Sequence, residues 1–385
     1  LATTTTTNDS IGVSVSRTEL SDWEQTGTVN DTLAYVNQND GGFETREFNF
    51  SSADNVYTVK ENLGNTAGKL TINGVADGDN KSTIDVNGYN GFVVGDGSEL
   101  NLSNVALENA IDSALILNSG STANIENVTF KNNSHTSSTS DVKGGAIYNR
   151  GTIGSITGDF VGNYVNATSG YAAGGAIYNY GTITTLTGDF VGNYAQGHDA
   201  SGGAIYNREG TIGSITGSFL NNYANATGSD GYAYGGAIYN RSTGTIETIA
   251  GNFIGNYVKF SQISTEYLAA SGGAIDNTGT ITLIKGYFEG NYVESLKTSE
   301  DYVGGIGGAI SNRGTIVDII ADFSSNYTKS PNSSSAGGAI YNDGTITTIT
   351  GNFVGNYAQS ESYHAAGGAI HNNGGTIDTI TGNFI

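Results

Sequence analysis

Short apolar runs, separated by glycine or asparagine, alternate with polar positions along most of the chain. The segment from Gly174 to Tyr194 reads GGAIYNYGTITTLTGDFVGNY, and the segment from Gly337 to Tyr357 reads GGAIYNDGTITTITGNFVGNY. Three runs in each segment, AIYN, TITTLT and DFVGNY, are rich in β-branched and aromatic residues and are bounded by turn-forming residues. This pattern predicts short strands and no helix in the repeated part.

The alternation also predicts which side chains share a face of a strand. A period of two places Ile177 and Asn179 on one face of the first run, and Ala176 and Tyr178 on the other. In the second run the apolar residues at positions 183 and 186 are three residues apart. A bend or bulge must therefore interrupt that strand.

The repeat starts at eight glycine pairs, with steps of 30, 28, 33, 37, 35, 30 and 30 residues between them: Gly144, Gly174, Gly202, Gly235, Gly272, Gly307, Gly337 and Gly367. The variation in length falls mainly between the closing Asn-Tyr and the next glycine pair. Segments there, such as AQGHDAS (Ala195 to Ser201) and VKFSQISTEYLAAS (Val258 to Ser271), differ from one another. We expect them to be loops on one side of a stack.

Three strands in about 21 residues cannot form a self-sufficient sheet, but they form one turn of a coil whose strands pair with the next turn. Propeller blades and leucine-rich repeats do not match this period or this consensus. We therefore predict an all-β, right-handed parallel β-helix, a solenoid of about 12–13 coils with a short N-terminal cap. Counted from about residue 40, its length would be on the order of 60 Å.

Each conserved position of the repeat then has a structural interpretation, because equivalent residues stack about 4.8 Å apart. Gly-Gly suits a corner with unusual dihedral angles or close backbone approach. The asparagine that closes the hexapeptide predicts a ladder of amide hydrogen bonds: Asn149, Asn179, Asn207, Asn240, Asn277, Asn312, Asn342 and Asn372. A second asparagine series precedes the terminal tyrosine: Asn163, Asn193, Asn222, Asn256, Asn291, Asn326 and Asn356. Phenylalanines predict an internal aromatic stack: Phe160, Phe190, Phe219, Phe253, Phe288, Phe323, Phe353 and Phe384.

We divide the chain into four segments. Residues 1–20 are predicted to be extended or disordered unless they pair with another segment, and residues 21–50 to form the N-terminal cap. Within the cap, TVNDTLAYVNQ (Thr28 to Gln38) is compatible with a short helix, and Trp23 would belong to the same cap. Residues 51–143 would be irregular coils, and residues 144–385 the eight GGAI(Y)N coils, truncated or continuing at the C-terminus.

Composition and charge restrict the class of protein. The chain has 58 glycines, one proline, no cysteine and no methionine, so we expect that an N-terminal segment, an export signal, has been removed. The net charge of −21 repels phosphate backbones and anionic lipid. We expect no nucleic-acid partner, and no membrane insertion because no apolar stretch approaches the required roughly 18 residues.

The repeated GGAI with a downstream F-x-x-N, as in Phe160 to Asn163, resembles the paired motifs of chlamydial-type polymorphic outer-membrane proteins and related autotransporter passenger domains. The resemblance covers about residues 70–385 and is strongest from Gly144. It implies a secreted or surface-exposed β-helical stalk, commonly adhesive and often delivered by a C-terminal outer-membrane β-barrel. No such barrel occurs in this sequence.

Candidate catalytic and metal-binding residues are few. Asp159 and Asp189 occupy matching positions, which other coils fill with Ser, Asn or Tyr, so a solvated outer position is favoured over a catalytic pair. The histidines, His135, His198, His364 and His371, show no metal-ligand spacing. DGDN (77–80) and GDGS (95–98) are interpreted as turns and not as Ca²⁺ sites. We assign no catalytic, cofactor-binding or metal-binding residue and no cofactor, and we expect no enzyme.

One set of side chains is a candidate contact strip. Period-2 alternation directs the hexapeptide tyrosines outward, where they would form a flat amphipathic surface that either binds glycan or protein or strengthens the rod: Tyr148, Tyr178, Tyr206 and Tyr239. The leading hypothesis is a noncatalytic extracellular rod of the bacterial cell surface that binds a host-cell or matrix protein or glycan, with loops 258–271 and 293–306 as further contact candidates. The alternative is a filament subunit that stacks on its own copies end to end, and a polysaccharide lyase or glycoside hydrolase is the third hypothesis.

Overall fold

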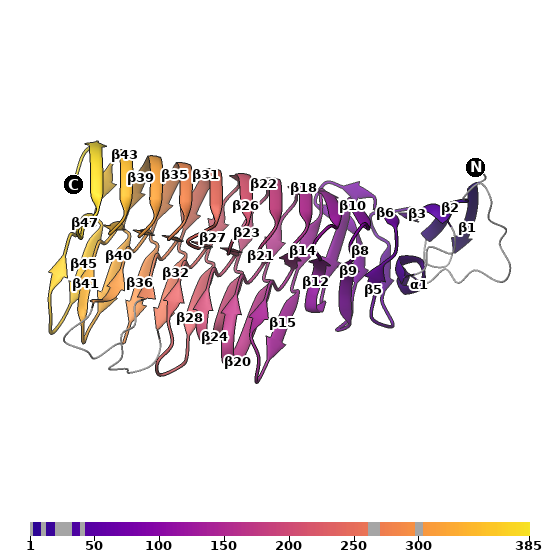
Figure 1. Ribbon diagram of the computed structural model, residues 1–385, viewed down its shortest axis with the longest axis horizontal. Helices are drawn as coiled ribbons and strands as arrows, with labels where there is room; N and C mark the ends of the chain where they lie inside the picture. Colours follow the sequence, from indigo (N-terminus) through magenta and orange to yellow (C-terminus); the bar gives the residue numbers. More distant parts are fainter. Residues whose placement is uncertain (1–2, 9–12, 20–32, 39–42, 261–269, 297–302) are drawn as a thin grey trace.

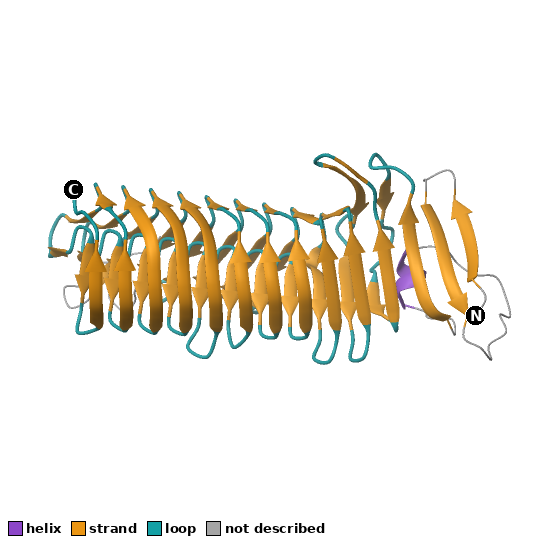
Figure 2. Cartoon of the chain, turned by 90° about the horizontal axis from the view of Figure 1, so that it is seen from above, coloured by secondary structure: helices purple, strands orange, loops and turns teal. Residues whose placement is uncertain are grey.

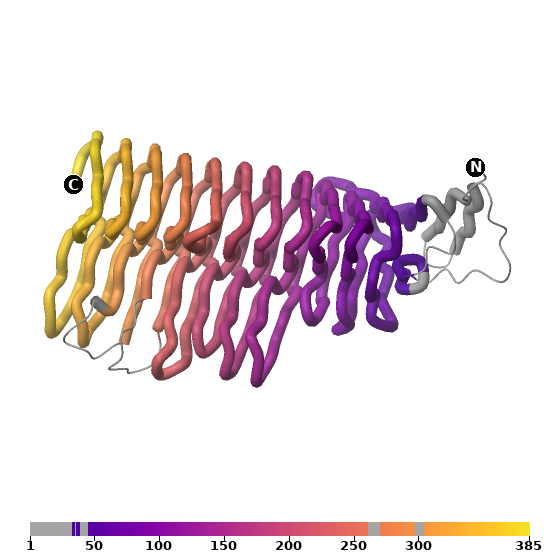
Figure 3. Tube along the Cα trace, in the orientation of Figure 1, coloured from indigo at the N-terminus to yellow at the C-terminus, as the bar shows by residue number. Residues whose placement is uncertain are grey.

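The chain winds into a long coil of strands, seen from the side in Figure 1. The computed structural model describes residues 3–8, 13–19, 33–38, 43–260, 270–296 and 303–385. Nearly every strand pairs in parallel with its equivalent in the coils before and after it, for example Ile177 with Ile147 and with Ile205. The trace in Figure 3 shows the same path returning at each turn. The fold is a parallel β-helix, as the sequence predicts.

One coil contributes strands to three sheets. In the second regular coil, β21 (Ile177–Asn179) belongs to sheet 2, and β22 (Thr182–Thr187) and β23 (Phe190–Val191) both belong to sheet 1. Strand β24 (Tyr194–Ser201) belongs to sheet 3. The prediction that 195–201 is a loop is therefore wrong: the segment continues from the closing Asn-Tyr as a strand, because its backbone pairs with both neighbouring coils.

Sheet 1 forms the broad side of the coil in Figure 2 and contains twelve successive parallel rungs within the described residues. These rungs are β3 (Phe43–Phe50), β6 (Lys69–Asn73), β10 (Glu99–Ser103), β13 (Thr122–Glu126), β18 (Thr152–Thr157), β22, β26 (Thr211–Thr216), β31 (Thr245–Ile254), β35 (Thr280–Glu289), β39 (Thr315–Ser324), β43 (Thr345–Thr350) and β48 (Thr376–Thr381). Shorter strands continue some rungs: β4 (Val56–Thr58), β8 (Asn80–Asp85), β11 (Val105–Glu108), β14 (Thr129–Lys131), β19 (Phe160–Val161), β23, β27 (Phe219–Leu220) and β44 (Phe353–Val354).

Sheets 2 and 3 complete the coil. Sheet 2 contains β5 (Gly64–Thr66), β9 (Asn90–Val94), β12 (Ile111–Leu117), β17 (Ile147–Asn149), β21, β25 (Ile205–Asn207), β30 (Ile238–Asn240), β34 (Ile275–Asn277), β38 (Ile310–Asn312), β42 (Ile340–Asn342) and β47 (Ile370–Asn372). Sheet 3 contains β15 (Ser134–Ser137), β16 (Val142–Lys143), β20 (Tyr164–Ala173), β24, β28 (Tyr223–Ala226), β29 (Ala233–Tyr234), β32 (Tyr257–Phe260), β33 (Ala270–Ser271), β36 (Tyr292–Ser295), β37 (Val303–Ile306), β40 (Tyr327–Ser330), β41 (Ser334–Ala336), β45 (Tyr357–Ser360) and β46 (Ala365–Ala366).

The predicted interruption of the second run is present. Ile183 and Leu186 are fully buried, whereas the two threonines between them are exposed. The irregularity enters where β13 meets β18: Ala123 pairs with Ile153, but Ile125 pairs with Ile156, so β18 holds one extra residue. Every later coil copies this bulge.

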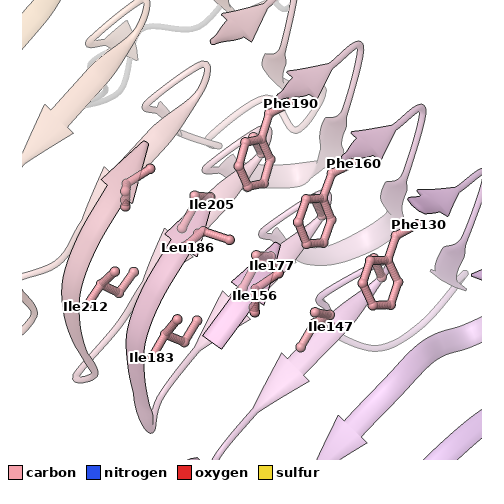
Figure 4. Packing of buried hydrophobic residues seen from close by; sticks show 14 of the residues in the cluster. Phe130, Ile147, Ile156, Phe160, Ile177, Ile183, Leu186, Phe190, Ile205 and Ile212 are labelled. Atoms are coloured by element: carbon pink, nitrogen blue, oxygen red, sulfur yellow. The ribbon is translucent and has the colours of Figure 1, made fainter. Parts of the chain in front are cut away.

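The interior of the coil is a column of phenylalanine and isoleucine, shown in part in Figure 4. The predicted phenylalanine stack is confirmed and starts one coil earlier, at Phe130. Ring centroids of successive coils lie 4.6 to 5.0 Å apart, with rings within 11° of parallel. This spacing follows the distance between paired strands, so the stack is imposed by the coil and strengthens it.

Each of the three corners is formed by one conserved element of the repeat. The glycine pair turns the chain from sheet 3 to sheet 2: Gly174 has a φ of +68°, and a Cβ on Gly175 would lie 2.0 Å from the carbonyl oxygen of Gly203. The first glycine therefore provides the left-handed conformation, and the second permits contact between coils. Both roles that the sequence predicts for Gly-Gly are confirmed.

The two asparagine series form the other two corners, and both predicted ladders are confirmed. Between sheets 2 and 1, each buried Nδ2 donates to Oδ1 of the equivalent asparagine in the next coil at 2.7 to 2.9 Å, unbroken from Asn149 to Asn372. Between sheets 1 and 3, the series begins at Asn133 and ends at Asn356, at 2.9 to 3.0 Å. Buried amide groups thus find partners without water.

Sheet 3 projects from the body of the coil as a double layer, which we call the flange. Strands such as β28 run outward and strands such as β29 return, and each forms its own parallel ladder. Small apolar side chains fill the space between the two ladders, including Val165, Ala167 and Ala172. Because these side chains are small, the two layers approach closely.

The first coil is covered by a short helix. Helix α1 (Leu33–Gln38) lies within the predicted capping segment and buries Leu33 and Val36 against the core. The buried guanidinium of Arg46 donates hydrogen bonds to the carbonyl oxygens of Val36 and Asn37 at the end of the helix. Strand β3, which carries Arg46, already pairs in parallel with β6, so the first coil starts within the segment assigned to the cap.

The N-terminal segment pairs with this first coil. Strands β1 (Thr3–Asn8) and β2 (Val13–Glu19) form an antiparallel pair, and β2 pairs antiparallel with β3. A two-residue strand, β7 (Ala76–Asp77), pairs with β8 around the turn at 77–80. Trp23 lies outside the described residues.

Candidate contact surfaces

The hexapeptide tyrosines do not form an exposed strip, so that prediction is wrong. Tyr178 and Tyr206 are 1% exposed, Tyr239 is 7% exposed and Tyr148 is half-buried. They do point away from the phenylalanine core, as the alternation predicts, but the outer face of the returning flange strands covers them. Tyr178, Tyr206 and Tyr239 cluster there with Ala173. The repeat period does not reveal this second layer, because it comes from the segments that differ most between coils.

A different row of tyrosines, which the sequence pattern did not reveal as a surface, is half-buried, and only its last member, Tyr357, is exposed. The tyrosine after each second-series asparagine starts the outgoing strand of the flange and stacks on its equivalent in the next coil: Tyr164, Tyr194, Tyr223, Tyr257, Tyr292, Tyr327 and Tyr357. We call these residues the flange tyrosine ladder. Centroids lie 4.8 to 5.1 Å apart, with rings within 7° of parallel. Each inner ring of the ladder stacks on a neighbouring ring on both sides, as Tyr223 does on Tyr194 and Tyr257.

Partial burial changes the ionisation of this ladder. Desolvation, followed by repulsion from the Tyr257 and Tyr194 phenolates, raises the pKa of Tyr223 to about 12. Desolvation, with smaller effects from Glu294 and Tyr357, also raises the pKa of Tyr327 to about 12. Tyr223 and Tyr327 therefore stay neutral well above the pH at which a free tyrosine ionises.

Arginines gather at one position of the coil, directly after the first-series asparagine. Four of the six arginines in the chain occupy it: Arg150, Arg208, Arg241 and Arg313. The backbone N–H at this position donates to the carbonyl oxygen of the residue at the asparagine position one coil earlier, which is Leu117 for Arg150 and an asparagine for the other three, so the side chains start from equivalent points along the axis. We call these four residues the arginine stripe. The recurrence of arginine after the motif asparagine is visible in the sequence, but only the coil shows that these arginines lie in a row along its axis.

Two members of the stripe reach back to the hexapeptide side chain of the preceding coil. Arg208 Nη1 donates to the Tyr178 hydroxyl at 3.1 Å, and its guanidinium lies 5.8 Å from the centre of the Tyr180 ring. Arg313 Nη2 donates to the carboxylate of Asp276, which stands in place of the hexapeptide tyrosine in the preceding coil. Tyrosine hydroxyls and guanidinium groups are thus paired along the corner.

The Asp276–Arg313 pair is a break in the consensus. Asp276 is fully buried, and its two carboxylate oxygens lie 2.9 and 2.8 Å from Nη2 of Arg313. Ser271 also donates to Asp276, and the Tyr234 ring lies 4.9 Å from the Arg313 guanidinium. The pair fills the volume of a missing tyrosine ring, so we assign it to packing of the corner.

The other candidate residues hold the coil together. Asp159 and Asp189 are exposed, and the Oδ1 of each accepts the backbone N–H of the next coil, at 2.9 Å for the first and 2.7 Å for the second. His198 lies in strand β24 and not in a loop, and its Nε2 lies 2.6 Å from Asp230. His371 stacks on Tyr341.

The remaining predicted segments are only partly described. Residues 95–98 form a turn, in which the Ser98 N–H donates to the Gly95 carbonyl, and 77–80 form the turn between β7 and β8. Segments 258–271 and 293–306 begin and end in strands of the flange, and 261–269 and 297–302 lie outside the described residues.

Fold and surfaces define a class of protein: a parallel β-helix solenoid with a projecting flange. Comparison with protein-family models, curated proteins and solved structures found no match to this chain. Across the described residues, no three or more His, Cys, Asp and Glu side chains come together in a group that would hold a metal ion. No helix in the described part is long and apolar enough to cross a membrane.

Proposed function

We propose that this chain is a noncatalytic structural and adhesive rod of the bacterial cell surface. The observation that carries the proposal is the continuity of the corners: the asparagine ladder between sheets 2 and 1 passes through eight coils without a gap. The stack of phenylalanines runs beside it over the same coils. Such a body transmits force along its axis and presents its surface at fixed spacing.

The variable part of each coil supports an adhesive role. The body of the coil is almost constant in length, whereas the flange carries the segments that differ in sequence and length between coils. Function concentrates on variable segments held by a rigid scaffold. The resemblance to autotransporter passenger domains agrees with this role and with an extracellular location.

A flow-chamber experiment tests the proposal. Beads coated with the chain should stay attached to animal cells or extracellular matrix under flow, and beads coated with an unrelated protein of similar net charge should wash off. Small-angle scattering should show a rod of roughly 50 to 60 Å, given twelve rungs about 4.8 Å apart. Loss of attached beads at the rate of the control, or release of sugars from polysaccharide by the chain, would contradict the proposal.

End-to-end stacking of copies is the second candidate. Each coil bonds to the next through the same two asparagine ladders, so the outer coil of one molecule would pair with that of another in the same way. Light scattering over a range of protein concentrations distinguishes the two: growth of the scattering mass with concentration supports stacking, and a constant mass supports the single rod.

A further inference from the structure

The arginine stripe is the place where positive charge gathers on a strongly acidic protein. The chain has 36 acidic and 15 basic residues, yet four of its six arginines share one coil position. Arg150 and Arg241 are exposed, and neither has a carboxylate within ion-pair distance among the described residues. Arg208 has a partner, Glu209 at 3.5 Å, but its side chain remains 36% exposed. Arg313 is paired with Asp276, and Asp343 occupies the equivalent position one coil later, so the unpaired positive charge of the stripe lies on Arg150 and Arg241.

The tyrosines beneath the stripe hold these guanidinium groups in place. The Tyr178 hydroxyl accepts one N–H of Arg208, and the hydroxyl of Tyr206 lies beside Arg241. A guanidinium has five N–H donors, so one bond to a hydroxyl leaves most of them available. A cation whose position is already fixed loses less side-chain entropy when it binds an anion.

The stripe is also linear. Counting from the first regular coil, arginines occupy coils one, three, four and six, so they follow the axis of the rod at multiples of about 4.8 Å. The exposed ring of Tyr180 occupies the same position in coil two, between Arg150 and Arg208. This arrangement suits a straight polymer with regularly spaced anionic groups better than a globular partner.

We propose that the arginine stripe binds a linear anionic polysaccharide, one whose sugar units carry carboxylate or sulfate groups. Guanidinium groups bind such planar or tetrahedral oxyanions with two parallel hydrogen bonds. The Tyr180 ring provides an apolar surface for the C–H face of a sugar ring. The inference gives the adhesive rod a ligand class, and so it rests on the proposed function.

Two other polymers fit the surface less well. An extended peptide binds most readily by adding a strand to an open sheet edge, but the backbone at this corner is already bonded to the neighbouring coils. Double-stranded DNA carries one charge per about 1.7 Å, so the net charge of −21 repels it more strongly than a chain with one charge per sugar.

Binding to immobilised polygalacturonate and heparin, measured by biolayer interferometry on the full chain, tests the inference. The stripe variant carries R150Q, R208Q and R241Q. The matched control carries K69Q, K131Q and K285Q, which remove the same charge from lysines elsewhere on the coils. We expect the stripe variant to lose at least about tenfold in affinity for one or both polyanions, and the control to lose less than about threefold.

Two further measurements keep the result interpretable. Circular dichroism should show that the variants retain the strand content, and a double variant, R150Q with R241Q, leaves the Arg208–Tyr178 bond intact and should still lose most of the affinity. No binding by the wild-type chain, equal loss in both triple variants, equal binding of a neutral glucan, or preferred binding of DNA would each overturn the inference. If beads coated with the chain still attach to cells in any of these cases, the proposed adhesive function holds and only the polysaccharide ligand is refuted.

Discussion

Replacement of Asn222 by alanine measures how much the asparagine ladder contributes to the coil. The side chain is fully buried and makes four hydrogen bonds. Its Nδ2 donates to the Phe190 carbonyl at 2.8 Å and to Asn256 Oδ1 at 3.0 Å, and its Oδ1 accepts from the backbone and side-chain nitrogens of Asn193 at 2.9 and 3.0 Å.

The expected loss in the free energy of unfolding depends on which hydrogen bonds the neighbouring asparagines keep in the Asn222→Ala variant. Asn193 Nδ2 still donates to the Phe160 carbonyl, and Asn256 Oδ1 still accepts from the residue 222 backbone N–H. The Asn193 backbone N–H, by contrast, loses its acceptor in a dry interior. One orphaned buried donor costs about 1 to 3 kcal/mol, and each weakened hydrogen bond adds about 0.5 to 1.5 kcal/mol. We expect Asn222→Ala to lower the free energy of unfolding by about 3 kcal/mol.

Denaturant unfolding followed by circular dichroism provides the measurement, with Asn252→Ala as the control because Asn252 is exposed. The control should change the free energy of unfolding by less than about 0.5 kcal/mol. Hydrogen exchange at the Asn193 amide should accelerate in the buried variant only. Equal effects of the two substitutions would refute the assignment of the ladder as a source of stability.

Three further predictions concern the corners. Gly175→Ala should lower the free energy of unfolding by about 3 kcal/mol or more, because the new Cβ would clash with the backbone of the next coil. Gly192 has a φ of +62° but open space around it, so Gly192→Ala should lower it by only about 1 to 2 kcal/mol; thermal melts compare the two. Ser325 has a φ of 56° at a position where other coils carry glycine or asparagine. Ser325→Gly should therefore raise the free energy of unfolding by about 0.5 to 1 kcal/mol and the melting temperature with it. A lower melting temperature would contradict this. Asp276→Ala should cost about 3 to 5 kcal/mol because the Arg313 guanidinium loses its carboxylate, and Asp276→Tyr combined with Arg313→Thr should recover most of it in denaturant unfolding; no recovery would refute the packing role.

The repeat made the body of the coil predictable. A residue that recurs once per coil stacks on its equivalent in the next coil, so the sequence alone predicts the phenylalanine stack in the core and the asparagine ladders at the corners. The bulge between Ile183 and Leu186 follows from spacing alone. These features depend only on contacts between equivalent residues of neighbouring coils.

The flange was not predictable in the same way. The flange strands differ in sequence from coil to coil, because strand pairing through the backbone tolerates nearly any side chain on the exposed face. Small apolar side chains fill the space between the two layers of the flange. The repeat alone predicts that Tyr178 faces solvent, but in the structure the flange covers its ring. The predicted tyrosine contact strip was therefore wrong because a second layer, whose sequence is unrelated to the repeat, packs against the first.

The flange tyrosine ladder has a consequence for stability at high pH. Tyr223 has a pKa of about 12 in the folded protein, because burial and neighbouring phenolates disfavour its charged form, against about 10 in an unfolded chain. Between these two values the folded state binds more protons than the unfolded state, so the free energy of unfolding falls as pH rises. Below about pH 10 the two states are equally protonated at this site, and the contribution is fully present.

Melting temperatures measured from pH 8 to pH 12 provide the test, with Tyr223→Phe as the variant. Phenylalanine keeps the stacked ring but cannot ionise, so the variant should lose less stability than the wild-type chain above about pH 10. Tyr287→Phe is the control, because Tyr287 lies in β35 of sheet 1 and outside the ladder. A Tyr223→Phe curve that falls as steeply as the wild-type curve would show that the ladder does not resist ionisation. In that case the stacked rings would be more open to water than their parallel packing at 4.8 Å implies.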